Sequence, residues 1–155
     1  MKKSSLILLV VMCFALFTQA QAQDNALVKN RAYTGATANH KMYHAVYQLD
    51  SNDPKVIEKT IRNINNALTD PRLAGHLQVE LVAFAGGTEA NLKGSKYEAA
   101  LKDLVDKGVI VAQCHNSLVE KKLDRSSIYD FIAVVPSGNG ELIIRQQQGW
   151  AIVKP

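Results

Sequence analysis

Residues 108–118 read GVIVAQCHNSL, and this segment has the pattern of a strand followed by a helix. Its first half, 109–113, is a short apolar run of the kind that forms a strand buried in a parallel sheet. The polar residues that follow Cys114 indicate that a helix begins at about Asn116 or Ser117. The stretch therefore predicts a strand that ends at Cys114 and passes almost directly into a helix.

The same alternation continues in both directions along the chain. Asp53-Pro54 is a helix start signal, and Ser95 with Glu98 predicts a capping box at the start of a second helix. Short connections between alternating strands and helices favour an α/β fold in which helices cover a parallel sheet. Apolar runs predict the other strands at 42–49, 78–84, 131–135 and 150–153.

The N-terminal segment has the layout of a secretory signal peptide. Two lysines precede an apolar run over 6–17, and a small-x-small cleavage motif, Ala20-Gln21-Ala22, follows it. A membrane-spanning helix needs about 20 apolar residues, so this run is short for one. We expect residues 1–22 to be removed and the protein to be exported, periplasmic or secreted, without membrane attachment after cleavage.

The rest of the chain predicts a flexible N-terminal arm, 23–40, and one domain, 41–155. The arm is polar and lacks sustained periodicity. The net charge of +4 includes two lysines of the predicted signal peptide, and no concentrated Lys/Arg stripe marks a nucleic-acid footprint. After cleavage Cys114 is the remaining cysteine, which excludes an internal disulfide.

Cys114 is the candidate reactive residue. Reactive groups in open parallel sheets gather at the carboxyl ends of the strands, and a thiolate beside a helix N-terminus is stabilised. Asn116 and Ser117 would cap the helix and help it hold a persulfide or another small anion. The Gly86-Gly87 turn after an earlier strand would leave room for that sulfur. The alternative is a packed, structural cysteine, because free cysteine is often buried.

The 108–118 segment resembles the region around the reactive cysteine of the DsrE/DsrF-like family. The run from Val135-Pro136-Ser137-Gly138 through Gly149-Trp150-Ala151 to Lys154-Pro155 is similar to that family's closing motif, and the resemblance covers 41–155. It implies a three-layer α/β/α domain with a five-stranded, mainly parallel sheet, assembled as a homo-oligomer, often a trimer or hexamer. It also implies that Cys114 carries sulfur as a persulfide between partner proteins.

The sequence departs from the family pattern at one turn. Phe84-Ala85-Gly86-Gly87 stands where many exported relatives have His-Gly-x-Gly, so the imidazole that would assist Cys114 is missing from this place.

Two functions from different classes follow. The first is an exported persulfide carrier in sulfur relay or sulfur oxidation, at most a sulfurtransferase-like thiol carrier, that works with a sulfur donor and an acceptor protein. The second is a non-catalytic, homo-oligomeric binding or assembly module in which Cys114 is structural or redox-sensing. We expect no cofactor, because Gly86-Gly87 lacks the spacing of nucleotide-binding loops. We expect no metal, because the histidines are scattered.

Overall fold

The computed structural model describes residues 25–155, so the predicted signal peptide lies outside the described residues. The chain divides into two compact units, of which the first ends at Thr37 and the second is Ala38–Pro155. In the first unit, residues 25–32 form a helix whose side chains are exposed. Across residues 25–155, no helix is long and apolar enough to cross a bilayer.

The second unit alternates strands with helices along its whole length. In chain order, its strands and α-helices are β1 (Tyr43–Leu49), α2 (Pro54–Thr69), β2 (Leu77–Ala83), α3 (Thr88–Asn91), α4 (Glu98–Asp106), β3 (Ile110–Cys114), α5 (His115–Glu120), β4 (Ala133–Val135), α6 (Gly138–Gln147) and β5 (Ala151–Val153). The predicted strands are therefore present, with ends that differ by one or two residues.

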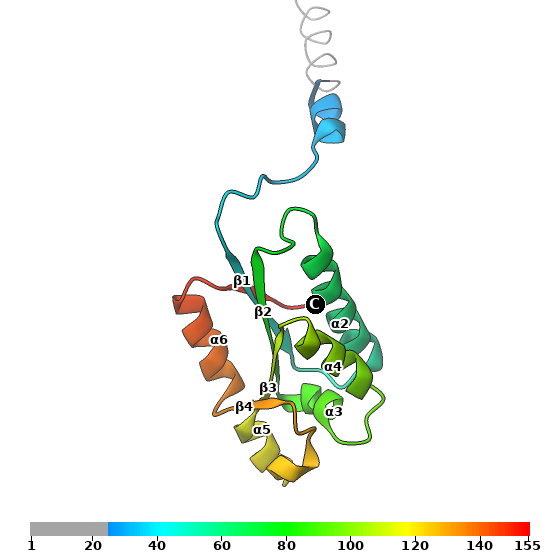
Figure 1. The fold of residues 1–155 in the computed structure, drawn as a ribbon, viewed down its shortest axis with the longest axis vertical. Coiled ribbons are helices and arrows are strands. Elements are labelled where there is room, and N and C mark those ends of the chain that lie inside the picture. The colour runs from blue at the N-terminus through cyan, green and yellow to red at the C-terminus, as the bar shows by residue number, and fades with distance from the viewer. Residues whose placement is uncertain (1–24) are drawn as a thin grey trace, which may run out of the picture. The chain divides into compact units, whose positions relative to one another are not determined.

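The strands form one five-stranded sheet in the order β4-β3-β2-β1-β5, and every pair is parallel. Figure 1 shows α6 on one face of the sheet and α2 and α4 on the other. This arrangement confirms the predicted α/β/α fold. Because all strands run the same way, their carboxyl ends lie along one edge of the sheet, and the β3–β4 register places Cys114 beside Val135 on that edge.

The two faces of the sheet carry hydrophobic cores of unequal size. The face under α2 and α4 holds the larger core, which includes Ile57, Ile64, Leu101 and Leu104, each at most 1% exposed. The face under α6 has a much smaller buried cluster, made of Val46, Val82, Leu142 and Trp150. The apolar contribution to the docking of α6 is accordingly modest, since this stabilisation scales with buried apolar area.

Local capping explains one predicted helix start and corrects another. The Asp53 carboxylate accepts from the Lys55 N–H at 2.9 Å, and Pro54 occupies the first turn of α2, as predicted. The predicted capping box at Ser95 and Glu98 is wrong, because Tyr97 is the N-cap of α4 and makes no side-chain capping bond. The Ser95 hydroxyl instead donates to the Ala90 carbonyl at 2.8 Å and accepts from the Tyr97 N–H at 3.3 Å.

Candidate functional site

Cys114 occupies the junction predicted for it, where a strand becomes a helix. It is the last residue of β3 and the N-cap of α5, with φ −67° and ψ 121°. Its side chain is 4% exposed and lies against a pocket of about 280 Å³ at the carboxyl edge of the sheet. The pocket is lined by Phe84, Ala85, Cys114, Asn116, Ser117, Glu120, Ser137, Gly138 and Asn139.

The sulfur of Cys114 receives hydrogen bonds that favour its anionic form. Burial is the largest single influence on the pKa of the thiol, and it raises that pKa. The Gly138 N–H, the Ser117 hydroxyl and N–H, and the Asn116 N–H donate to the sulfur and act in the opposite direction. Together they outweigh burial, so the pKa of Cys114 lies below its ordinary value. The site therefore stabilises a thiolate with neutral donors.

The Ser117 hydroxyl is held between the Ala85 N–H and the thiol pocket. Its hydroxyl oxygen accepts from the Ala85 N–H at 2.8 Å, which leaves the hydroxyl hydrogen for Cys114. Ala85 has φ 47°, a left-handed conformation that is uncommon for a residue other than glycine. The hydrogen bond that Ala85 donates to Ser117 helps to hold this turn beside the thiol, and so joins the segments that follow β2 and β3.

Gly138 brings a second helix to the same sulfur. It is the first residue of α6, directly after the N-cap Ser137, whose hydroxyl accepts from the Gly140 N–H at 3.2 Å. A Cβ atom at position 138 would lie 2.8 Å from Cδ1 of Phe84, which is too close for any side chain. Glycine is therefore needed here so that α6 can approach the Phe84 ring while its N–H reaches Cys114.

The buried side-chain amide of Gln113 holds the backbone of Cys114 in place. The side chain of Gln113 is fully buried, and its Nε2 donates both to the Cys114 carbonyl and to the Thr88 hydroxyl, each at 3.0 Å. Its Oε1 accepts from Nδ2 of Asn91 at 3.0 Å. Helix α3, which supplies Thr88 and Asn91, thus helps to hold the end of β3 in place.

The structure brings some of the predicted site residues to the sulfur and places others elsewhere. Asn116 and Ser117 lie at the thiol, although α5 begins at His115 and Ser117 acts inside the helix rather than as its cap. Gly86 lies against the β1–α2 connection, and a Cβ on Gly87 would lie 2.0 Å from the carbonyl oxygen of Leu49, the last residue of β1. Their lack of side chains serves this close packing.

Residues that sequence reasoning did not assign to the site complete it. Phe84 and Ala85 form the wall expected from the glycine pair, and Gly138 supplies a donor. The position of Gly138 after β4 was a signal for its role. Strand β4 pairs with β3 and ends directly beside Cys114, so the residues that follow β4 lie near the thiol. Among the described residues that line the pocket, none is a histidine, so this wall offers no imidazole as a base.

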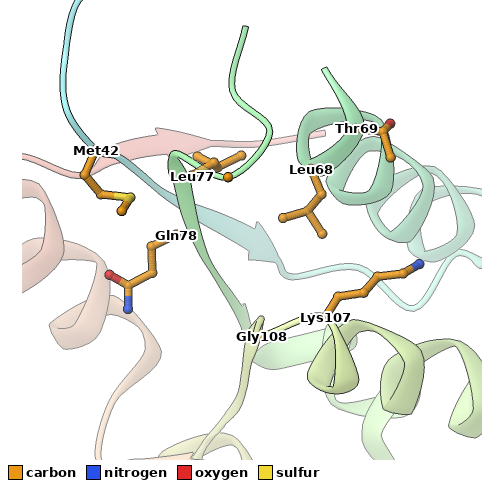
Figure 2. A pocket seen from close by; sticks show the side chains of 8 residues that line it. Met42, Leu68, Thr69, Leu77, Gln78, Lys107 and Gly108 are labelled. Carbon is orange, nitrogen blue, oxygen red and sulfur yellow. The ribbon is translucent and has the colours of Figure 1, made fainter. Parts of the chain in front are cut away.

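A larger pocket, of about 570 Å³, opens at the opposite edge of the sheet (Figure 2). Met42, Leu77 and Gly108, at the amino ends of the strands, contribute to its lining. The ammonium group of Lys107 in this pocket donates to Oδ1 of Asn65 at 2.7 Å. Within residues 25–155, no three His, Cys, Asp or Glu side chains are grouped to hold a metal ion. The thiol pocket is therefore the candidate site.

Comparison with known proteins places this domain in a family. The model of the DsrE/DsrF-like family matches residues 41–155, which include the whole sheet and the thiol pocket. A solved structure of a protein of unknown function from Methanobacterium thermoautotrophicum, MTH1491, is 28% identical to this chain with a TM-score of 0.69. The similarity covers 73% of this chain and 99% of that one. Among curated proteins, none matches the chain.

Proposed function

The chain belongs to the DsrE/DsrF-like family, and from that premise we propose that it is an exported persulfide carrier in which Cys114 bears the transferred sulfur. The observation that carries the proposal is the set of donors around this sulfur. The Gly138 N–H, the Ser117 hydroxyl and N–H, and the Asn116 N–H favour the thiolate, which is the nucleophilic form of cysteine.

The chemistry that fits this arrangement is transfer of a sulfane sulfur. The Cys114 thiolate attacks the outer sulfur of a donor persulfide or polysulfide, and a new S–S bond forms on Cys114. The donor's own S–S bond breaks, and its electron pair leaves on the donor thiolate, which takes up a proton from water. A thiolate of the acceptor then attacks the outer sulfur on Cys114 in the same way. The sulfur atom changes partner, and the exchange needs no external oxidant or reductant.

The absence of a histidine from the described pocket wall is compatible with this chemistry. A general base is needed when a thiol must lose its proton during attack. Here neutral donors favour the thiolate before the attack begins, and the same donors suit the anionic outer sulfur of a persulfide. The protein would therefore act at most as a sulfurtransferase-like carrier.

The pocket dimensions suit a small sulfur donor or the thiol-bearing tip of a partner. A pocket of about 280 Å³ has room for an extended side chain that ends in sulfur. Its polar residues, Asn116, Glu120 and Asn139, surround the approach to Cys114. A partner would thus have to present its sulfur on a narrow group.

The proposal includes export and self-association. Export rests on the signal peptide that the sequence predicts over residues 1–22. A homo-oligomer is supported by large apolar side chains on the surface of α6 and on the edge strand β5, of a kind usually covered in assemblies. These are Ile143, Ile144 and Ile152, which are 64%, 53% and 41% exposed.

A loading experiment tests the proposal. Purified wild type and Cys114→Ser are incubated with inorganic polysulfide, and persulfide is read by mass after trapping with an alkylating reagent. We expect loading on the Cys114 peptide of the wild type and none in the variant. Unchanged thermal melting of Cys114→Ser would show that its fold is intact. Equal loading of both proteins would rule out Cys114 as the carrier.

The second candidate is a non-catalytic binding module with a structural cysteine. The low exposure of Cys114, 4%, favours it, because a packed thiol reacts slowly. Alkylation with iodoacetamide distinguishes the two functions. A carrier is modified at Cys114 in the native state, whereas a structural cysteine is modified only after the protein unfolds.

A further inference from the structure

A buried carboxylate lies under α6 and takes no part in the chemistry described above. Glu80, in β2, is 1% exposed, and its carboxylate accepts from Nε of Arg145 at 2.6 Å. Nε of Arg145 also lies 3.0 Å from the Glu141 carboxylate, and the guanidinium sits 4.2 Å from the centre of the Trp150 ring. This polar cluster joins the middle of the sheet to the C-terminal half of α6.

Burying this polar cluster costs free energy of folding. Burial of a carboxylate is unfavourable, and the pKa of Glu80 is raised chiefly for this reason, although Arg145 opposes the shift. An apolar pair could fill the same space and dock the helix at least as firmly. An ion pair differs from apolar contacts in being directional, so it defines where a helix sits along a sheet.

The same helix begins at Gly138, which lines the pocket together with Cys114. Glu80 pairs with Ile110 in the sheet, four residues before Cys114, which corresponds to about 13 Å along the strand. Gly138 precedes Arg145 by seven residues, or about 10 Å of α-helix. An anchor at Arg145 can therefore set the place of Gly138 at the sheet edge.

We propose that Glu80 and Arg145 are positioning residues for the thiol site: their ion pair fixes α6 along the sheet and thereby holds the Gly138 N–H against the sulfur of Cys114. This inference deepens the proposed function and rests on Cys114 being reactive. The small apolar cluster under α6 leaves much of the placement of this helix to the ion pair. Glu80 and Arg145 act through Gly138 and touch neither the sulfur nor its substrate.

The variant Glu80→Gln separates positioning from a direct charge effect, because the two have opposite signs. Loss of a negative charge acts directly on Cys114 by favouring the thiolate, which would move the pH profile of alkylation to lower pH. A shift of α6 away from the sulfur removes a donor and moves the profile to higher pH. We expect the second result, with alkylation at neutral pH slowed by about three- to tenfold.

A second variant tests the same helix without changing any charge. Arg145→Lys keeps the positive charge but lacks the planar guanidinium whose Nε donates to the Glu80 carboxylate. We expect the pH profile of alkylation to move to higher pH here too. The matched control is Glu58→Gln, which breaks the exposed Lys96–Glu58 pair, 2.7 Å long, on α2. The control should alkylate like the wild type.

The results decide the proposal in each direction. A shift to lower pH in Glu80→Gln, or an unchanged profile in that variant, would overturn it. Should Glu80→Gln fail to fold, as judged by circular dichroism, an unchanged profile in Arg145→Lys would overturn it equally. Alkylation requires no bound persulfide, so these results stand whether or not the protein loads sulfur. A failed loading test with a responsive pH profile would reject the carrier function alone.

Discussion

The two edges of the sheet each bear a pocket, and the pockets differ in almost every respect. The carboxyl edge has the smaller one, about 280 Å³, and Cys114 lies in its wall. The amino edge has the larger one, about 570 Å³, lined by side chains such as Met42 and Leu68 and without a nucleophilic thiol among its described lining residues. Size alone would select the wrong edge for thiol chemistry.

The difference follows from the direction of the backbone. At the carboxyl edge the chain leaves strands β3 and β4 and enters helices α5 and α6, so free N–H groups point toward the edge. At the amino edge the helices end, and their last carbonyl groups point toward that edge, as at the end of α4 before Gly108. An anionic sulfur is therefore stabilised at one edge of the sheet and disfavoured at the other.

Among the changes at the two edges, Gly138→Ala is expected to have the largest effect on stability and on the reactivity of Cys114. Its new Cβ would lie 2.8 Å from the Phe84 ring, so α6 or the ring must move. We expect a loss of stability of about 1–3 kcal/mol, read from urea unfolding, and native alkylation of Cys114 slowed by more than about tenfold. The matched control is Gly140→Ala, where the nearest atom to a new Cβ, Cβ of Ser137, is 3.3 Å away. Equal behaviour of the two variants would contradict the role of Gly138.

A smaller effect is expected from Ser117→Ala. This change removes one donor to the sulfur and leaves the Ala85 N–H without its acceptor. The donors lower the pKa of Cys114, so the loss of one donor raises that pKa. The pH at which the alkylation rate increases is therefore expected to be higher in the variant. At neutral pH we expect a rate lower by about tenfold. Ser126→Ala, in an exposed turn, is the control. A profile that does not move in Ser117→Ala would show that the hydroxyl does not act on the thiolate.

The smallest effect is expected at the amino edge. Met42 is 46% exposed in the larger pocket, so Met42→Ala should cost less than about 1 kcal/mol of stability. The pH profile of Cys114 alkylation should coincide with that of the wild type. A slower reaction in Met42→Ala would mean that the two edges are coupled and would weaken the comparison.

Much of the fold was predictable because it depends on local patterns. Apolar runs located the strands, and Asp53-Pro54 located the start of α2, since the capping carboxylate and the proline act within one turn. The end of β3 at Cys114 was also predictable, because buried parallel strands have continuous apolar runs in their sequences. The four-residue helix α3 was missed because periodicity needs a longer window.

The site was less predictable because its contacts join distant segments. Ser117 was expected to cap its own helix, yet its hydroxyl bonds the Ala85 N–H, 32 residues away in the sequence. Gly86 and Gly87 were expected beside the sulfur, but close packing against the β1–α2 connection and the end of β1 accounts for them. Helix caps and glycine turns have recognisable sequences, whereas the partner that each one meets is decided by how the elements pack.

The most direct test of the central claim is the intact mass of the protein purified, without reductant, from the cells that make it. We predict a species heavier than the unmodified chain by one sulfur atom, which disappears on treatment with a reducing thiol and maps to the Cys114 peptide. An unmodified chain at every growth condition that supplies sulfane sulfur would contradict the account of Cys114 as a persulfide carrier.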